Sequence, residues 1–370
     1  MVIQVASAER PVGSASVIVG LVLLWVLTFV ASSQAQPRVA SEFVPNPDTA
    51  ELRVATDHWL VWERTTVANP GSHVLRITYH YYLQRNVGES AQLVYQYGPT
   101  VFERQLVRGV LRDGTLVMEK TESALFLVKR DGTKIALSGY PVRFGKDRAE
   151  FLAVYDDGVL VRAGDPNKYK PVYFIPWLAN GLDTGKMFKV TDATGVYGYT
   201  SQVFRKGNVL ALIGARLMLF NLADRTHQYF SFGSLPNWFP AINAFDGETV
   251  VFGPSYACYI GTNYDCYTKP SFNIKTGSQF LGVVAGSAIA VKNNIVYVLQ
   301  ERDDNCNEIK CSLHLAAYDL QSTDDSNRIL MDVKDIKPRE ITYVLREDAL
   351  VVWNGRQWKR IEWLPDTRRR

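Results

Sequence analysis

The chain has 370 residues, of which 47% are hydrophobic and 21% charged, and its formal net charge is +4. This composition is that of a folded protein with a sizeable core, and it excludes a disordered or collagen-like chain. The net charge is too low, and acids and bases are too evenly mixed, to indicate nucleic-acid binding. The later segments are rich in Val, Tyr, Phe and Thr, which favour strands.

The first 35 residues differ from the rest of the chain. Arg10 precedes an uninterrupted apolar run, Val17–Ala31, and Ser33-Gln34-Ala35 then places small residues where signal peptidase requires them. This order is typical of a secretory signal peptide. The run is shorter than the roughly 20 residues that span a bilayer, although the weakly charged start leaves an uncleaved membrane anchor as the alternative. We therefore expect an exported protein, secreted or periplasmic, with a signal peptide at residues 1–35.

One pattern recurs along the chain: an apolar strand, a tight polar turn and a second apolar strand. The turns consist of Asp, Gly, Asn, Lys and Glu, residue types that suit tight hairpins. The copies lie about 40 to 56 residues apart, a spacing close to that of repeated β-sheet units. There are seven of them: Val54–Arg64, Val110–Lys120, Val154–Gly164, Phe204–Gly214, Phe245–Ser255, Val291–Glu301 and Leu345–Gly355.

A second repeat lies downstream within three of these units, where each copy precedes another short strand. The copies are LFNLADRT (Leu219–Thr226), SFNIKTGS (Ser271–Ser278) and AYDLQSTD (Ala317–Asp324). They resemble the Asp/Asn-x-x-Thr-Gly turns between the third and fourth strands of quinoprotein-like β-propellers, a superfamily that includes WD40-like repeats. The resemblance implies an all-β fold, a β-propeller of seven four-stranded blades, between residues 51 and 366. A pair of β-sandwiches and a six-bladed ring are the alternatives.

The last repeat contains only three apparent strands: Ile341–Arg346, Ala349–Trp353 and Trp358–Trp363. Residues 36–50 form a separate N-terminal segment. The hypothesis is that Val39–Val44 in this segment supplies the missing strand and closes the last blade. Pro45 and Pro47 would end that strand, which is tolerable at a sheet edge.

The cysteines agree with export, because disulfides persist in oxidising compartments. Four cysteines allow three connectivities, and the local pairing Cys258–Cys266 and Cys306–Cys311 fits best because each bond would clasp one hairpin tip. Cys258 and Cys306 are 48 positions apart, and Cys266 and Cys311 are 45 apart, which matches the repeat period. Each pair would then join the second and third strands of consecutive blades. A four-cysteine zinc site is the alternative, but its usual short spacing is missing.

Most catalytic signatures are absent, including the nucleophile elbow, the zinc-binding His helix, the phosphate loop and the dinucleotide fingerprint. The five histidines are scattered, and the acidic pair Asp156-Asp157 falls in a repeated turn. We therefore predict no catalytic residue, no metal and no cofactor.

Aromatic residues provide the strongest functional signal. In propellers, the loop between blades and the loop between the second and third strands share one face, which commonly carries the ligand site. Pro236–Pro240 is predicted to be such an inter-blade loop, on the same face as the Cys258–Cys266 tip. Trp and Tyr on stapled loops offer rigid stacking area, although Trp238 and Phe239 capping the core is the alternative. The predicted ligand-binding residues are Trp238, Phe239, Tyr256, Tyr259, Tyr264 and Tyr267.

These features together predict an exported, disulfide-stapled propeller that binds a protein or a glycan on its loop face. No nucleic-acid partner is expected, and membrane contact is expected only through an uncleaved signal anchor. The alternative is an extracellular or periplasmic enzyme, glycoside-cleaving or quinone-dependent, that works at the central channel. That alternative requires charged side chains from several blades near the axis.

Overall fold

The chain divides into two compact units, Met1–Ser41 and Glu42–Arg370. The computed structural model describes residues that all belong to the second unit. They are 43–68, 75–101, 103–120, 124–138, 142–144, 147–163, 171–179, 181–191, 203–213, 217–230, 240–254, 267–273, 279–280, 284–285, 287–301, 311–320, 328–336 and 342–365. Within these ranges, no helix is long and apolar enough to cross a membrane.

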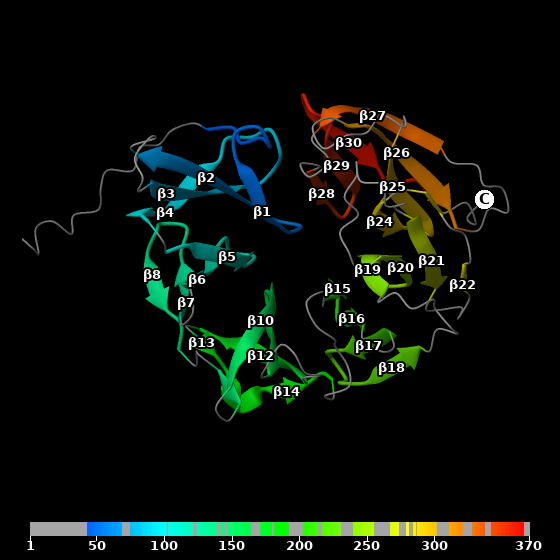
Figure 1. Ribbon diagram of the computed structural model, residues 1–370. Coiled ribbons are helices and arrows are strands. Elements are labelled where there is room, and N and C mark those ends of the chain that lie inside the picture. The colour runs from blue at the N-terminus through cyan, green and yellow to red at the C-terminus, as the bar shows by residue number, and fades with distance from the viewer. Residues whose placement is uncertain are drawn as a thin grey trace, which may run out of the picture. The chain divides into compact units, whose positions relative to one another are not determined.

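The described residues form seven antiparallel sheets whose strands pair in chain order, except that β14 pairs with β12 and β23 with β21 (Figure 1). Sheet 1 contains β1 (Glu51–Ala55), β2 (Leu60–Ala68), β3 (Arg76–Gln84) and β4 (Gln92–Thr100). Sheet 2 contains β5 (Gln105–Val110), β6 (Leu116–Lys120), β7 (Ala124–Val128) and β8 (Lys134–Ala136). Sheet 3 contains β9 (Arg143–Phe144), β10 (Asp147–Tyr155), β11 (Gly158–Ala163), β12 (Val172–Leu178), β13 (Gly181–Leu182) and β14 (Phe188–Lys189), with a 3-10 turn at Thr184–Lys186.

The other four sheets follow the same order. Sheet 4 contains β15 (Phe204–Lys206), β16 (Val209–Ile213), β17 (Leu217–Asn221) and β18 (His227–Phe230). Sheet 5 contains β19 (Pro240–Phe245), β20 (Thr249–Pro254), β21 (Tyr267–Asn273), β22 (Gln279–Phe280) and β23 (Val284–Ala285). Sheet 6 contains β24 (Ser287–Lys292), β25 (Ile295–Glu301), β26 (Cys311–Asp319) and β27 (Arg328–Ile336), and sheet 7 contains β28 (Tyr343–Leu345), β29 (Ala349–Trp353) and β30 (Trp358–Glu362).

The hairpins predicted from the repeat are confirmed. Each forms the first pair of antiparallel strands within its sheet, apart from the short β9 that precedes β10 in sheet 3. The second predicted repeat begins at the end of the third strand in sheets 4, 5 and 6, and its first copy forms the turn β17–β18. Residues 274–278 and 321–324 of the other two copies lie outside the described residues. The second strands carry runs such as Leu60-Val61-Trp62 that are fully buried, because both faces of each sheet are covered by neighbouring sheets.

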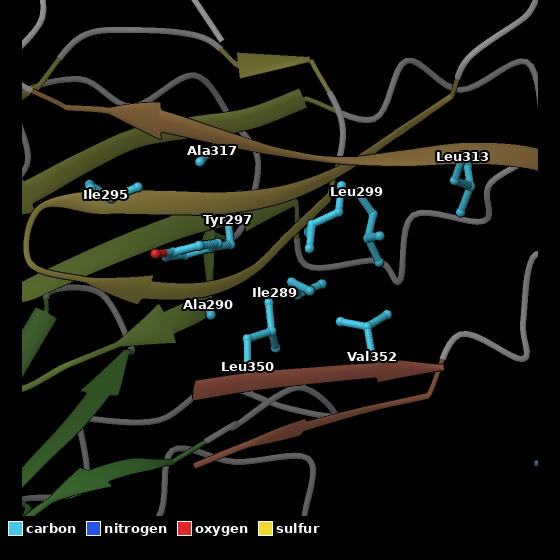
Figure 2. Packing of buried hydrophobic residues seen from close by; sticks show 10 residues of the cluster. Ile289, Ala290, Ile295, Tyr297, Leu299, Leu313, Ala317, Leu350 and Val352 are labelled. Atoms are coloured by element: carbon cyan, nitrogen blue, oxygen red, sulfur yellow. The ribbon is translucent and has the colours of Figure 1, made fainter. Parts of the chain in front are cut away.

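The core consists of seven hydrophobic clusters, and each cluster joins two sheets. Six clusters join successive sheets, and another joins sheet 7 back to sheet 1. Figure 2 shows the cluster between sheets 6 and 7, where Tyr297 and Leu299 of β25 lie against Leu350 and Val352 of β29. The first strands also touch one another, β1 with β5, β5 with β10, and β19 with β24. Meander sheets that pack face to face in a closed succession are the β-propeller fold, as the sequence predicts.

The hypothesis that Val39–Val44 supplies a strand to the last sheet stays a prediction, because residues 39–42 lie outside the described residues. Sheet 7 has three strands among the described residues, and Phe43 forms a bridge with Ala91 beside β4 of sheet 1. Side chains join the last and first sheets: Trp62 of β2 meets Trp358 of β30 edge to face, with ring centroids 6.1 Å apart. The Arg346 guanidinium also donates to the carbonyls of Thr56 and Arg85, over 2.6 and 2.8 Å.

Candidate functional site

Each sheet has two different ends. The turns between first and second strands and between third and fourth strands lie at one end, which we call the turn end. The connections between second and third strands and from one sheet to the next leave from the other, the connection end. This assignment follows from the antiparallel order of the strands.

Strand register brings the predicted ligand-binding segments to one end of sheet 5. Pro240, the first residue of β19, pairs with Pro254, the last residue of β20. The segment 231–239 therefore enters, and the segment 255–266 leaves, at the connection end. Tyr267 opens β21 and pairs with Ala285. Trp238, Phe239, Tyr256, Tyr259 and Tyr264 themselves lie outside the described residues, and the side chain of Tyr267 is not described.

The cysteines fall at the connections between second and third strands, as the repeat predicts. Cys258 and Cys266 fall between β20 and β21, and Cys306 falls between β25 and β26, which begins at Cys311. These are the second-to-third connections of consecutive sheets, which touch through β19 and β24. Cys258, Cys266 and Cys306 lie outside the described residues, so the two disulfides stay a prediction.

At the turn end, hydrogen bonds join the turns of successive sheets. The Trp59 indole donates to the Arg112 carbonyl (2.9 Å), and the Arg112 N–H donates to Asp156 Oδ1 (2.6 Å). Asp157 accepts two bonds from the Arg205 guanidinium, one of them 2.7 Å long. The pair Asp156-Asp157 is thus a turn, as predicted. It also links sheet 3 to sheets 2 and 4, an effect that the sequence does not reveal.

Charged residues occupy an equivalent position in the second strands of sheets 1, 2 and 3, directly after three buried apolar residues. These are Glu63, Glu119 and Arg162, and each pairs with an opposite charge on the first strand of its own sheet. In sheets 1 and 2 the partners are Arg53 and Arg108, which stand at a one-residue register shift in β1 and β5. Such a bulge re-aims its side chain, and here it brings the guanidinium to the carboxylate.

Glu63 forms the most deeply buried of these clusters, between sheets 1 and 2. Its side chain is 3% exposed, and its carboxylate accepts bonds from Arg53 (2.8 and 3.1 Å) and from Arg104 (3.0 Å). The hydroxyls of Tyr81 and Tyr95 donate to the backbone and side-chain oxygens of Gln105. Burial, and then the charge of Glu63, raises the pKa of Tyr81. A carboxylate that accepts bonds from two guanidiniums is suited to joining sheets, because one guanidinium comes from β1 and the other from the segment just before β5.

The tyrosines of this cluster predict an alkaline sensitivity. Burial raises the pKa of Tyr95 to about 12, above the ordinary value of about 10. Stability from the protonated hydroxyl is therefore complete below pH ~10 and is lost as pH rises through about 12. In this window we expect Tyr95 to lower the free energy of unfolding by about 1.4 kcal/mol per pH unit. Urea unfolding of the wild type and of Tyr95→Phe, across this range, measures the difference in slope; equal slopes would contradict it.

The described histidines lie apart from one another, as expected. His80 shares a hydrogen bond with Thr66 (3.1 Å), and burial and the charge of Arg64 lower its pKa. His314 shares one with Gln300 (2.8 Å). No group of three potential metal ligands occurs within the part of the chain that the structure describes.

Two groups of side chains were not predicted from the sequence: the Glu63 cluster, and a pair of arginines that lie over the Trp59 ring. The first had a visible signal, since LVWE in one repeat and LVME in the next end the buried run with the same acid. Arg104, 41 residues from Glu63, had none. The arginines on Trp59 come from two different sheets, so no local pattern could indicate them.

Comparison with known proteins finds similar folds but identifies no family. No protein-family model and no curated protein sequence matches the chain. Among solved structures, a chain in the "Crystal Structure of Mitotic Checkpoint Complex" is similar at 12% identity and a TM-score of 0.45, over 98% of this chain and 97% of that one. The β-propeller domain of the Trilobed protease from Pyrococcus furiosus is similar at 10% identity and a TM-score of 0.43, over 84% of this chain and 97% of that one. An acylaminoacyl peptidase of Pyrococcus horikoshii matches at 11% identity and a TM-score of 0.42, over 85% of this chain and 52% of that one.

Proposed function

We propose that this chain is an exported, disulfide-stapled β-propeller that acts as a binding or scaffold module for a protein or a glycan. The observation that carries the proposal is the pairing of Pro240 with Pro254. Because β19 begins and β20 ends at the same end of sheet 5, this pairing supports a location near that end for both segments that contain the predicted aromatic residues. The proposed localisation, secreted or periplasmic, rests on the signal-peptide pattern of residues 1–35.

The aromatic residues favour binding for a physical reason. Trp, Tyr and Phe bury large areas with few rotatable bonds, so they contribute strongly to an interface at a low entropic cost. Two disulfides, Cys258–Cys266 and Cys306–Cys311, would hold the neighbouring connections in place and lower that cost further. The partner would then stack against Trp238, Phe239 and the tyrosines between β20 and β21.

The alternative, an enzyme at the central channel, requires carboxylates or bases that are free to react. Four carboxylates on the first two strands of sheets 1 to 3 contact an arginine: Glu51, Glu63, Glu119 and Glu150. In these ion pairs the carboxylate oxygens are engaged by guanidiniums. These residues therefore support a binding role over the catalytic one.

Alanine substitution at the connection end of sheet 5 tests the proposal. A partner is first isolated from the extracytoplasmic fluid of the source cells and purified, and its affinity is measured by titration. We expect Trp238→Ala and Phe239→Ala to weaken binding by about tenfold or more, the effect of losing a central aromatic contact. Tyr229→Ala is the control, because Tyr229 is an exposed aromatic on β18 outside these segments. Affinities equal to that of the wild type in both variants would rule this surface out.

A further inference from the structure

The turn end of sheets 1 and 2 carries an unusual stack of side chains around Trp59. The Trp59 side chain is buried, and its ring nitrogen is held by the Arg112 carbonyl. The guanidinium carbon of Arg85, directly after β3, lies 4.9 Å from the centroid of the indole ring. The guanidinium carbon of Arg130, in the turn β7–β8, lies 5.2 Å from the same ring. Two cations from two sheets thus share one aromatic side chain.

Neither cation has an acidic partner. Among the described residues, no ion pair joins Arg85 or Arg130 to a carboxylate, and both residues are exposed. Several nearby acids have other partners: Asp113 with Lys129 (3.5 Å) and with the Thr115 N–H, Asp156 with the Arg112 N–H, and Asp131 with the Thr133 N–H. A third guanidinium is close, since Arg346 donates to the Arg85 carbonyl, but the charges of Asp57 and Asp348 act on it. Arg85 and Arg130, which have no such ion pair, are the cations that favour the arrival of an anion.

The contact with the ring also holds the arginines in place. A cation over an indole gains about 0.5–1 kcal/mol at an exposed site, and both arginines remain exposed. The N–H edge of a guanidinium matches the two oxygens of a carboxylate, with which it forms paired charge-assisted hydrogen bonds. Arg130 is held further because its Cγ and Cδ pass over Gly114, where an added Cβ would approach them to 2.8–2.9 Å.

We propose that Arg85 and Arg130, held against Trp59, bind the carboxylates of an acidic segment of a protein partner. Two separate planar forks suit two carboxylate side chains better than one tetrahedral phosphate or sulfate, whose ligands converge on a single centre. This inference rests on the proposed function as a binding module, and it adds a second surface at the opposite end of the sheets with a defined ligand chemistry.

A peptide of about ten residues with alternating Glu and Ser is the probe, titrated calorimetrically into the full chain at low salt. We expect Arg85→Gln and Arg130→Gln each to weaken binding about tenfold, the effect of losing one charge-assisted pair. Arg76→Gln is the matched control, because Arg76 is exposed and begins the same strand, β3, that ends beside Arg85. The peptide with Gln in place of Glu should not bind.

Several outcomes would overturn the inference. One is wild-type affinity in both arginine variants; another is equal losses in Arg76→Gln, which would indicate a general charge effect. Tighter binding of inorganic phosphate or of a sulfated polysaccharide, lost in the same variants, would assign the stack to a different ligand.

Control variants cover a loss of stability. If Arg85→Gln lowers the melting temperature, Arg85→Lys decides, since it keeps the charge but not the planar fork and should still lose affinity. Trp238→Ala should bind the peptide normally, so this test fails or succeeds separately from that of the connection end.

Discussion

Replacing Trp62 by alanine is expected to lower the free energy of unfolding by about 3–5 kcal/mol, the usual cost of truncating a buried aromatic residue. Trp62 is fully buried between the first and last sheets, where it packs with Val344, Val351 and Trp358. Its indole N–H also donates to Gln84 Oε1 over 2.8 Å. The substitution therefore opens a cavity and removes a buried hydrogen bond at the contact that closes the succession of sheets.

Urea unfolding followed by far-ultraviolet circular dichroism measures this effect, since fluorescence would change with the loss of a tryptophan. Trp62→Phe keeps most of the volume and should cost less, so the pair separates packing from the hydrogen bond. Tyr229→Ala, an exposed aromatic on β18, should change stability by less than about 0.5 kcal/mol. A loss below about 1 kcal/mol for Trp62→Ala would mean that this contact contributes little to the fold.

Replacing Glu63 by glutamine is expected to lower the free energy of unfolding by about 3 kcal/mol, because it breaks a buried ion pair by removing one partner. The Arg53 and Arg104 guanidiniums, with side chains 25% and 39% exposed, would then stand beside a neutral amide. Most of the cost comes from leaving a partly buried charge without its partner. It falls at the lower end of the usual range because both arginines can still reach water.

The exposed pair Arg360–Asp348 is the matched comparison. Its side chains are 52% and 66% exposed, so Asp348→Asn should change stability much less than Glu63→Gln does. Both variants are measured by the same urea unfolding at neutral pH. Equal effects in the two variants would show that burial between sheets 1 and 2 does not strengthen the Glu63 pair.

Local features of the sequence were sufficient to predict the hairpins. A turn such as Asp113-Gly114 between two apolar runs specifies its own hairpin, because turn residues and alternating burial act over about ten residues. The three-stranded form of the last sheet and the third-to-fourth turns were also visible. The short strands β9, β13, β14 and β23 were not, since two-residue pairings carry no pattern of their own.

The contacts between sheets could not be predicted in the same way. Arg104 reaches Glu63 over 41 positions, and Trp62 meets Trp358 across most of the chain. Phe43 bridges to Ala91 beside β4 and packs against the cluster that joins sheets 1 and 7. Such partners are selected by how sheets stack, and neither turn chemistry nor strand periodicity contains that information.

By itself, the sequence determined that this protein is built from repeated hairpins in an all-β fold, and it favoured a propeller over a pair of β-sandwiches. Hairpin formation is governed by neighbouring residues, so it can be predicted from a short stretch of sequence. Only the tertiary structure decided where the charges go: Glu63 into a buried pair with two arginines, Asp156 and Asp157 into bonds with other sheets, and Arg85 and Arg130 onto one indole. The physical reason is that the strength and partner of a charge depend on burial and on side chains brought from distant segments.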